Sequence, residues 1–389
     1  MKQNRILHIS PTDIRYDSRI LKELNALGAL PNSTIMAFGI DDREDKTYDI
    51  NHQFNIKTFN LLSKKVTFLP RPVKLALNTI EAFFKLIFPI KRYKPTIIHC
   101  HDTLYLPIAL VGKFICKSKL IYDAHELESD KAGQSRILSR YTLFVEKYSW
   151  NRIDMLIGAS PSQINWYNDN IGQKESLLVL NSPIFNEKLI DNVKNDYLRK
   201  KFKIPTENKI FLYLGIIGCE GRGVKLYLDT FQNKDIDSHL VFIGYGEYAE
   251  EVEKISKNYQ NIHYHEAVPH DKVVEISNSA DIGLCMIEHV SLSDYYCLPN
   301  KFFEYAFSGL YILATDFPDM KLILDRYDLG ECCKYDEKEF QKAVKSIESR
   351  KIIKEQRNLN LLSWEHQAEQ LNKKYYKLIN IENNPCVEQ

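Results

Sequence analysis

A chain of 389 residues with 44% hydrophobic and 26% charged residues has a globular composition and is long enough for two domains, so neither a disordered chain nor a coiled coil is suggested. The 52 basic and 51 acidic residues leave a net charge of +1, which argues against a nucleic-acid-binding surface over a whole face. The eight cysteines include no Cys-x-x-Cys pair, so buried free thiols are expected rather than a zinc site or disulfides.

The chain begins with a short lead into an apolar, strand-like segment, so no signal peptide is expected. No apolar run reaches the roughly 18 residues that a membrane-spanning helix needs. We therefore expect a cytoplasmic protein, and contact with the inner face of the cell membrane stays open.

Short apolar runs alternate with helix-like or loop segments along the chain. In the first half, the predicted strands cover 5–10, 33–39, 96–101, 119–125, 155–160 and 176–183. In the second half, the predicted strands cover 210–215, 240–244, 262–265, 282–287 and 311–315, and the predicted helices cover 224–231, 270–280 and 300–309. A polar, charged connection at 185–209 separates the halves, and a further amphipathic helix is expected at 362–380.

This alternation predicts an α/β fold with parallel sheets. Two such runs predict two doubly wound, Rossmann-like domains, at residues 1–185 and 186–363, and the last helix, within 364–389, is expected to pack back on the first domain. Open sheets of this kind bind ligands beyond the carboxyl ends of their strands. The cleft between the domains is therefore the expected site.

The stretch “CLPNKFFEYAFSG” at 297–309 has the pattern of an anion-binding helix start. Pro299 suits the position before a helix, and Asn300 can cap it. Free backbone N–H groups at a helix N-terminus bind anions, and Lys301 adds a positive charge. Glu304 lies on the same face, where it can accept hydrogen bonds from vicinal hydroxyls. A phosphate with a ribose fits this pattern, and a capped surface helix with ordinary charges fits it as well.

Several ordered segments resemble the motifs of retaining glycosyltransferases of family 4, which have the GT-B architecture of two facing Rossmann-like domains. The matching segments are “LPNKFFEYAFSGLYILATDFP” (298–318), “LVFIGYGEY” (240–248), “DSRILKELNALG” (17–28), “IIHCHD” (97–102), “IYDAHE” (121–126) and the closing helix “SWEHQAEQL” (363–371). The segment 264–284 resembles the part of the family that packs around the nucleotide base. The resemblance spans nearly the whole chain. It implies a bacterial enzyme of cell-envelope or capsule polysaccharide biosynthesis.

The resemblance implies a donor site in the second domain. Glu304 would bind the ribose of a nucleotide sugar, and Asn300 and Lys301 would lie beside the diphosphate or the donor sugar. Arg222, in a Gly-rich turn, falls where the family has a phosphate-binding lysine, and its planar fork suits a diphosphate. Uridine is the favoured base. The other donor-site candidates in the matched segments are Gly215, Gly244, Val268 and Tyr296.

Two positions depart from the family pattern. Tyr296 stands where the family often has a second glutamate, and Ile216 stands where it often has an arginine. Support for the leaving diphosphate would then rest on Arg222 and Lys301. Asp294 is a candidate for the missing carboxylate.

In the first domain, polar residues at strand ends are the candidates for its side of the cleft. The resemblance places a histidine near His125 against the donor sugar, which makes His125 the third catalytic candidate with Arg222 and Lys301; a structural role is the alternative. Glu126 follows it directly in the sequence. Another predicted strand ends at His101 and Asp102, whereas His99, on the same strand, is expected in the core.

The loop “SPTDIRYDSR” (10–19) follows the first predicted strand and lacks the family's usual pair of glycines. Such loops close over donor and acceptor, so Asp13 and Asp17 are acceptor-side candidates. Pairing of Asp17 with Arg19 at the helix start explains these charges equally well. No His/Asp/Glu set shows metal-ligand spacing, so no metal or cofactor is expected, and arginine, lysine and helix dipoles would stabilise the diphosphate.

Residues 64–94 contain eight Lys or Arg, and Glu81 is their one acidic residue, among many apolar residues. A basic amphipathic helix of this kind lies at an anionic membrane surface. A core-facing helix with solvated lysines is the alternative.

Together these features predict a metal-independent, retaining glycosyltransferase that uses a nucleotide-diphosphate sugar, with UDP favoured. The acceptor would be a hydroxyl of a glycan or a lipid-linked glycan. Two alternatives stay open: a nucleotide-sugar-binding partner subunit without transfer activity, and a nucleotide-sugar epimerase of the same fold.

Overall fold

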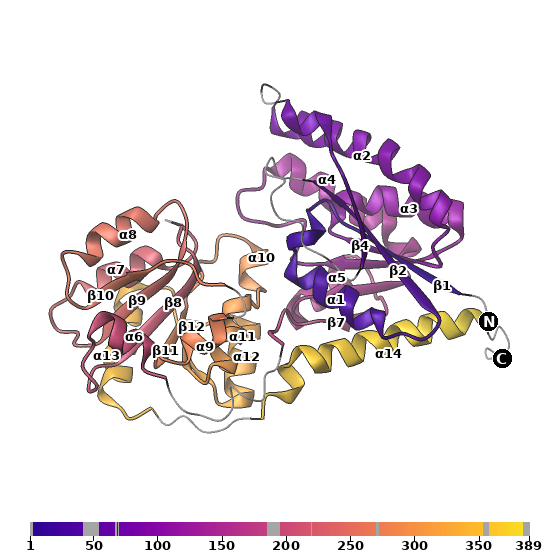
Figure 1. The fold of residues 1–389 in the computed structure, drawn as a ribbon. Coiled ribbons are helices and arrows are strands. Elements are labelled where there is room, and N and C mark those ends of the chain that lie inside the picture. Colours follow the sequence, from indigo (N-terminus) through magenta and orange to yellow (C-terminus); the bar gives the residue numbers. More distant parts are fainter. Residues whose placement is uncertain are drawn as a thin grey trace. The chain divides into compact units, whose positions relative to one another are not determined.

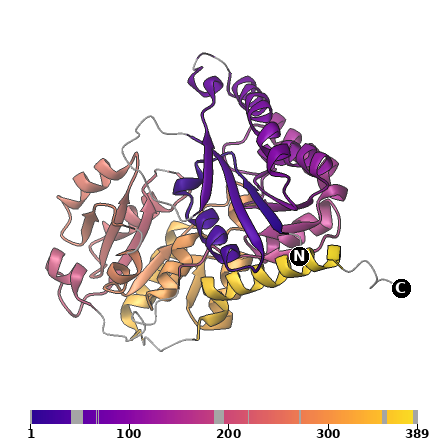
Figure 2. The same cartoon turned by 45° about the vertical axis from the view of Figure 1, so that its right-hand side comes forward.

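The computed structural model describes residues 3–41, 54–66, 68, 70–184, 195–218, 220–269, 272–352 and 358–383. The chain divides into two compact units. The N-terminal unit comprises Met1–Leu180 and His366–Gln389, and the C-terminal unit comprises Asn181–Glu365. Figures 1 and 2 show the ribbon of both units.

The N-terminal unit has a seven-stranded parallel sheet in the order β3-β2-β1-β4-β5-β6-β7. Its strands are β1 (Asn4–Ile9), β2 (Ser33–Ile40), β3 (Asn55–Phe59), β4 (Ile97–His101), β5 (Lys119–Ala124), β6 (Met155–Gly158) and β7 (Ser176–Leu178). Its helices are α1 (Ser18–Gly28), α2 (Arg71–Tyr93), α3 (Leu106–Cys116), α4 (Arg136–Ser149), α5 (Pro161–Asn170) and most of α14 (Trp364–Asn383). Strands β4, β5 and β6 are almost wholly buried, as expected of a parallel sheet covered on both faces.

The C-terminal unit has a six-stranded parallel sheet in the order β10-β9-β8-β11-β12-β13. Its strands are β8 (Ile210–Ile216), β9 (His239–Tyr245), β10 (Ile262–His265), β11 (Ile282–Cys285), β12 (Tyr311–Thr315) and β13 (Gly330–Cys333). Its helices are α6 (Tyr197–Phe202), α7 (Val224–Phe231), α8 (Ala249–Ser256), α9 (Val273–Ser277), α10 (Leu292–Tyr295), α11 (Asn300–Phe307), α12 (Pro318–Tyr327) and α13 (Glu337–Ser349).

The last helix, α14, packs on the N-terminal unit. Residues from His366 onward belong to this unit. Leu371 and Tyr375 on this helix are fully buried. Gln367 Oε1 accepts a hydrogen bond from the backbone N–H of Leu180, at 3.2 Å. Figures 1 and 2 both show this helix, in yellow, running along the N-terminal sheet and its helices.

The predicted fold class, two doubly wound α/β domains with parallel sheets, is confirmed. Every predicted strand is present, and the sequence missed only the two edge strands β3 and β13 among the described residues. Of the predicted connection at 185–209, residues 185–194 lie outside the described residues and 197–202 form α6. The helix predicted at 270–280 is the shorter α9. The first two residues of the predicted range, 270 and 271, lie outside the described residues.

The expectations on thiols and membrane spans are met within the described residues. The six cysteines that the structure describes are all free. Their partly or fully buried positions agree with the prediction of free thiols, and Cys219 and Cys386 lie outside the described ranges. No helix in the described ranges is long and apolar enough to cross a bilayer.

Candidate functional site

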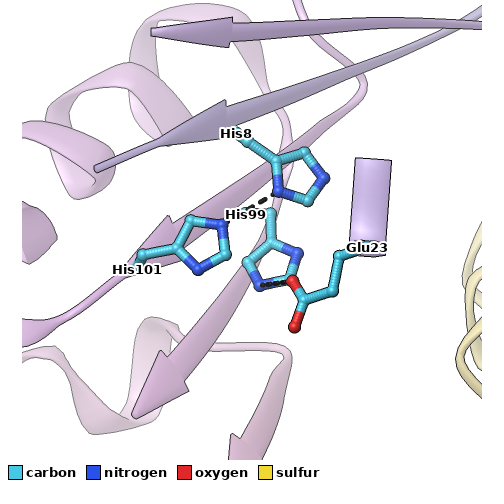
Figure 3. A group of neighbouring side chains, drawn as sticks. All are labelled: His8, Glu23, His99 and His101. Atoms are coloured by element: carbon cyan, nitrogen blue, oxygen red, sulfur yellow. Dashed lines mark hydrogen bonds and ion pairs between the residues drawn. The ribbon is translucent and has the colours of Figure 1, made fainter. Parts of the chain in front are cut away.

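In the N-terminal unit, polar side chains gather near the ends of three adjacent strands. The parallel registers align His8 of β1 with His99 of β4, and His101 of β4 with Asp123 of β5. All four side chains are buried. Figure 3 shows the three histidines beside Glu23 of α1. Buried polar groups need partners. These residues contact one another, but Nε2 of His8 and both carboxylate oxygens of Glu23 have no hydrogen-bond partner among the described residues.

Asp123 is the centre of this cluster. Its Oδ1 accepts a hydrogen bond from Arg19 Nη2 at 3.0 Å. Its Oδ2 lies 3.2 Å from His101 Nδ1 and 3.4 Å from both His99 Nε2 and His125 Nε2. Burial alone would raise the pKa of Asp123, but the positive charges of Arg19 and His125 hold it well below the usual range. Asp123 is therefore ionised at neutral pH.

His125 carries the complementary positive charge. Burial lowers its pKa, but Asp102 and Asp123 outweigh burial and raise the pKa to about 10. His125 Nε2 lies 3.0 Å from His101 Nδ1, and His101 Nε2 lies 2.9 Å from His8 Nδ1. Burial lowers the pKa values of His101 and His8, so both are neutral. Both His101 and His125 donate a hydrogen bond to Asp123, which helps to lower the pKa of that carboxyl.

Asp102, directly after β4, has an unusual backbone conformation. Its φ is 61° and its ψ is 156°, in a region that favours glycine. Its Oδ1 lies 3.8 Å from Nδ1 of His125. Strained residues of this kind persist only where the surrounding structure holds them, and they cluster at functional sites. The strain and the ion pair both support Asp102 as a site residue.

We expect the substitution Asp102→Gly to uncouple stability from function. Glycine relieves backbone strain of about 1–3 kcal/mol and costs roughly 0.5–1 kcal/mol in unfolded-chain entropy. Both Asp102→Gly and Asp102→Asn lose the ion pair with His125, so the pKa of His125, followed by NMR, should fall in both variants. The thermal unfolding midpoint should be higher in Asp102→Gly than in Asp102→Asn, because only glycine relieves the backbone strain. A large loss of stability in Asp102→Gly alone would contradict the strain.

Two groups of side chains within the described ranges lie close enough to offer ligand atoms to a metal ion: His8, Glu23, His99 and His101, and His101, Asp123 and His125. The sequence could not show them, because their members come from separate elements. The rings of His99 and His101 are stacked 4.3 Å apart at 20°, so their nitrogen lone pairs lie in nearly parallel planes and do not converge on one point. Arg19 already lies 3.0 Å from Asp123 and 3.2 Å from Glu23, as their positive counter-charge. These groups are therefore balanced without an ion.

The acidic residues of the first loop have local partners. Asp13 accepts hydrogen bonds from Arg15 Nε and Nη2 at 2.9 and 2.6 Å. Asp17 caps α1 by accepting from the backbone N–H groups of Arg19 and Ile20. Asp17 and Arg19 do pair at the helix start, through the backbone N–H of Arg19, whereas the Arg19 guanidinium turns inward to the buried carboxylates.

Two further candidates of the first domain differ in their surroundings. Glu126 is exposed and pairs with Lys131 at 3.0 Å, so it is not part of the buried cluster. His99 is buried, as expected of a core residue, but it also belongs to the polar cluster. Its Nδ1 lies 2.6 Å from the hydroxyl of Tyr375 on α14.

In the C-terminal unit, α11 places the predicted donor-binding residues. The chain enters the helix through Pro299, and no side chain caps it. The expected capping role of Asn300 is wrong: Asn300 is the first helical residue, and its Oδ1 accepts from Asn181 Nδ2 at 2.7 Å. Lys301 and Glu304, both 8% exposed, are nearly buried. The buried charges exclude the alternative of an ordinary surface helix.

Lys301 lies over an aromatic ring, and a second cation acts on its charge. Its ammonium lies 4.0 Å from the ring centroid of Tyr213. Burial, together with the positive charge of Arg222, lowers its pKa to about 8, while Cys285 and Glu304 oppose the shift. Arg222 itself is exposed, in the turn before α7. Arg222 is therefore placed where its charge acts on Lys301.

The predicted glycines lie side by side where β8 and β9 end. Gly215 is paired with Gly244 in the parallel register. Their φ values are 122° and 155°. A Cβ atom on Gly244 would lie 1.8 Å from the carbonyl oxygen of Gly215. Only glycine allows the two strand ends to approach this closely.

We expect Gly244→Ala to destabilise the C-terminal unit by about 1–3 kcal/mol or more, because the added methyl overlaps backbone atoms that cannot move aside. Gly309→Ala is the matched control, since Gly309 also has a positive φ, of 70°, but open space around its Cβ position. The control should cost only about 1–2 kcal/mol. Thermal unfolding midpoints measure both, and equal losses would contradict the close approach.

The two departures from the family pattern lie near these elements. Ile216 ends β8 and is 55% exposed. Tyr296 is half-buried just after α10. Asp294 Oδ2 accepts from Ser291 Oγ at 2.7 Å in a capping arrangement, so one carboxylate oxygen is engaged. Val268 follows β10 and is half-buried.

Sequence inspection missed the polar core of the N-terminal site. Asp123 and His8 were not singled out, although each interrupts an apolar, buried strand. Glu23 and Arg19 lie on the buried face of α1, where charged residues are rare. Charged residues at buried positions of the predicted elements were the available signal.

Comparison with known proteins adds a family match and a fold match. Residues 208–349 match the family model described as “Glycosyl transferases group 1”. This segment contains the turn before α7 and all of α11. No curated protein sequence matches the chain.

Solved structures match over nearly the whole chain at low sequence identity. Sucrose-phosphate synthase from Thermosynechococcus elongatus has a TM-score of 0.74 and 16% identity, over 97% of this chain and 100% of that one. HepE from Anabaena, in complex with UDP-glucose, has a TM-score of 0.66 and 12% identity, over 96% and 99%. α,α-Trehalose 6-phosphate synthase from Burkholderia multivorans has a TM-score of 0.67 and 11% identity, over 99% and 100%.

Proposed function

Since the chain has the GT-B fold of glycosyltransferases and its C-terminal unit matches glycosyl transferases group 1, we propose that it is a retaining, nucleotide-sugar-dependent glycosyltransferase. It would move a sugar from a nucleoside diphosphate to a hydroxyl of a glycan or lipid-linked glycan. UDP is the proposed nucleotide, which the UDP-glucose bound to the similar HepE fold supports. Retention of configuration rests on the resemblance to family 4.

The observation that carries this proposal is the buried cation at the start of α11: Lys301 is 8% exposed, and its ammonium lies 4.0 Å from the ring centroid of Tyr213. Arg222 lowers the pKa of the buried Lys301, so the two like charges repel in the unliganded protein. Such an arrangement is costly unless an anion joins it, and a diphosphate carries the matching charge. Glu304, one helical turn from Lys301, would accept hydrogen bonds from the ribose hydroxyls.

Charge stabilisation would be the main chemical contribution of these residues. As the bond from sugar to phosphate breaks, negative charge grows on the leaving diphosphate. Arg222 and Lys301 would stabilise this charge without a metal ion. In the N-terminal unit, His125 is an imidazolium whose pKa Asp102 and Asp123 raise, so it can donate a hydrogen bond to a sugar oxygen. None of the described side chains is assigned as a covalent nucleophile.

The proposed location is the cytoplasmic side of the cell membrane. Most of the basic segment 64–94 forms α2, a long helix whose exposed residues include Phe84 and Phe88. Apolar side chains next to lysines and arginines suit peripheral contact with anionic lipid.

The test is a panel of nucleotide sugars incubated with the protein and cell-envelope glycan extracts, with release of free nucleotide as the readout. Release with one donor is expected, and Glu304→Ala should abolish most of it. Binding of a donor without release would favour the second candidate, a partner subunit that binds nucleotide sugar, for which Tyr296 and Ile216 are the motivating departures. Conversion of the donor to an epimer would contradict transfer. Full activity in Glu304→Ala would contradict the residue assignment.

A further inference from the structure

Two helices of the N-terminal unit expose apolar stripes. On α2 the large exposed apolar side chains recur every three or four residues, at Val73, Leu77, Ile80, Phe84 and Phe88. On α4 they recur in the same way, at Ile137, Tyr141, Phe144 and Tyr148. Phe84 is 70% exposed and Ile137 is 78% exposed. Helix α3 packs against both helices and exposes Phe114 and Ile115. An apolar surface over three helices marks an interaction site.

The charge on these helices is positive. Exposed basic side chains are Lys91 and Arg92 on α2, and Arg136, Arg140 and Lys147 on α4. Helices α2 and α4 each have one acidic residue, and both of these residues accept hydrogen bonds. Glu81 accepts from the backbone N–H groups of Leu62 and Ser63, and Glu146 is buried and accepts from the hydroxyls of Tyr122 and Tyr167. Anionic lipid headgroups complement such a surface.

A cavity of about 330 Å³ lies between the first turns of α2 and α4. Its apolar lining includes Leu75 of α2, Leu104 after β4, and Leu138 and Tyr141 of α4. Tyr141 belongs to both the cavity and the exposed stripe on α4. The cavity is therefore continuous with the apolar surface, and its volume lies in the range of small-molecule sites.

The other side of the cavity reaches the strand ends of the candidate site. Thr103 and Glu128 line it. Thr103 follows Asp102 directly, and Glu128 lies three residues after His125. The same cavity thus touches the apolar stripe of α4 and the loops that carry the proposed acceptor-side residues.

We propose that this cavity binds the apolar chain of a membrane lipid that carries the acceptor. The apolar chain of the lipid enters from the α2–α4 surface, which rests on an anionic bilayer. The lipid headgroup faces the loops after β4 and β5. This inference rests on the proposed function, because it names the lipid-linked class among the acceptors. It also makes α4 a second membrane-contacting helix beside α2.

Photolabelling tests the cavity directly. The full-length protein is mixed with vesicles of phosphatidylcholine and phosphatidylglycerol that contain a diazirine-tagged probe, either farnesyl phosphate or a palmitoyl phosphatidylglycerol. After irradiation, mass spectrometry locates the labelled residues. We expect labels on the peptides with Leu75, Leu138 or Tyr141. The probe that labels more strongly shows whether the site takes an isoprenoid or an acyl chain. No label at these positions with either probe would overturn the proposal.

Ala132→Trp provides a variant that blocks the cavity. Ala132 lines the cavity and is exposed, so a larger side chain can be accommodated without disturbing the core. Labelling of the cavity peptides should fall at least tenfold, whereas the matched Ala132→Ser variant should label like the wild type. Equal labelling of both variants would contradict a cavity-bound chain.

Donor binding, measured by calorimetry on the same samples, separates the two proposals. A protein that binds a nucleotide sugar but is not labelled in the cavity retains the proposed function and loses this inference. A protein that is labelled but binds no nucleotide sugar has a lipid site and loses the proposed function.

Discussion

Replacing Arg222 with alanine is expected to lower kcat/KM for the nucleotide-sugar donor by about 10²–10³, the usual effect of removing one group that stabilises developing charge. Arg222 lies in the turn before α7 and acts electrostatically on Lys301. Its planar guanidinium can make two parallel hydrogen bonds to a diphosphate. Steady-state kinetics with the donor found in the panel measures the effect.

Two further variants make this prediction specific. Arg222→Lys retains the positive charge but lacks the planar guanidinium that can make two parallel hydrogen bonds. An intermediate loss of kcat/KM is therefore expected. Lys225→Ala removes an exposed cation three residues further along the chain and should change kcat/KM less than twofold. A loss in Lys225→Ala as large as in Arg222→Ala would show that only overall charge matters.

Lys301 adds a pH dependence to the same site. Its pKa of about 8 lies below the ordinary value because of burial, so Lys301 loses its proton as the pH rises through that value. Donor affinity should therefore fall above pH 8 in the wild-type protein. In Lys301→Met, affinity should be low at every pH and this fall should be absent. Calorimetric titrations between pH 6.5 and 9.5 would compare them.

The second large effect is expected for Asp123→Asn. The substitution removes the negative charge that lies 3.0 Å from Arg19 and 3.4 Å from His125. Breaking a buried ion pair from one side leaves an uncompensated charge and costs about 3–5 kcal/mol. We expect a clearly lower thermal unfolding midpoint for the N-terminal unit and a lower pKa for His125.

The pH dependence of stability has a defined sign. In the folded protein the pKa of His125 is raised to about 10, above its unfolded value of about 6.5. The stability that His125 contributes is fully present below pH ~6.5 and is lost as the pH rises toward 10. In Asp123→Asn this decline should shrink, because the raised pKa depends on Asp123. Unfolding midpoints at pH 6.5, 8 and 9.5 would show it.

Glu23 must be separated from His125 in this experiment. Burial and the charge of Asp123 raise the pKa of Glu23 well above the usual range, so Glu23 also makes stability fall with rising pH. Glu23→Gln removes its share and leaves that of His125. If Glu23→Gln abolished the whole decline between pH 6.5 and 9.5, the assignment to His125 would be wrong. NMR titration of the His125 ring is the direct check.

The sequence predicted the central strands well because parallel strands covered on both faces are continuous apolar runs. It missed β3 and β13, which are edge strands with polar or glycine residues such as Lys57 and Gly330. The α/β class followed from the alternation of apolar runs with helix patterns, and the assignment of Arg222 and Lys301 to one donor site followed from the family resemblance of their segments. These depend on local pattern, which a single sequence records.

The buried charge cluster could not be predicted in the same way. Its members come from β1, α1, β4 and β5, and only the strand order β1-β4-β5 brings them together. The spacing of these residues along the sequence therefore gave no sign of the cluster, which the register between the strands creates. The inward turn of Arg19 is likewise set by the buried Asp123, more than 100 residues away along the chain. Local pattern left pairing with its neighbour Asp17 and a substrate role equally open.

The contact between Tyr375 and His99 constrains the order in which the chain folds during synthesis. The ribosome makes β1 through β7 first, yet the hydroxyl that lies 2.6 Å from the buried His99 comes from the last helix, 276 residues later. Until that helix docks, the core face that Leu371 and Tyr375 cover is exposed to water. The core of the N-terminal unit is therefore completed only after the C-terminal unit has been translated, so the two units do not fold independently in chain order.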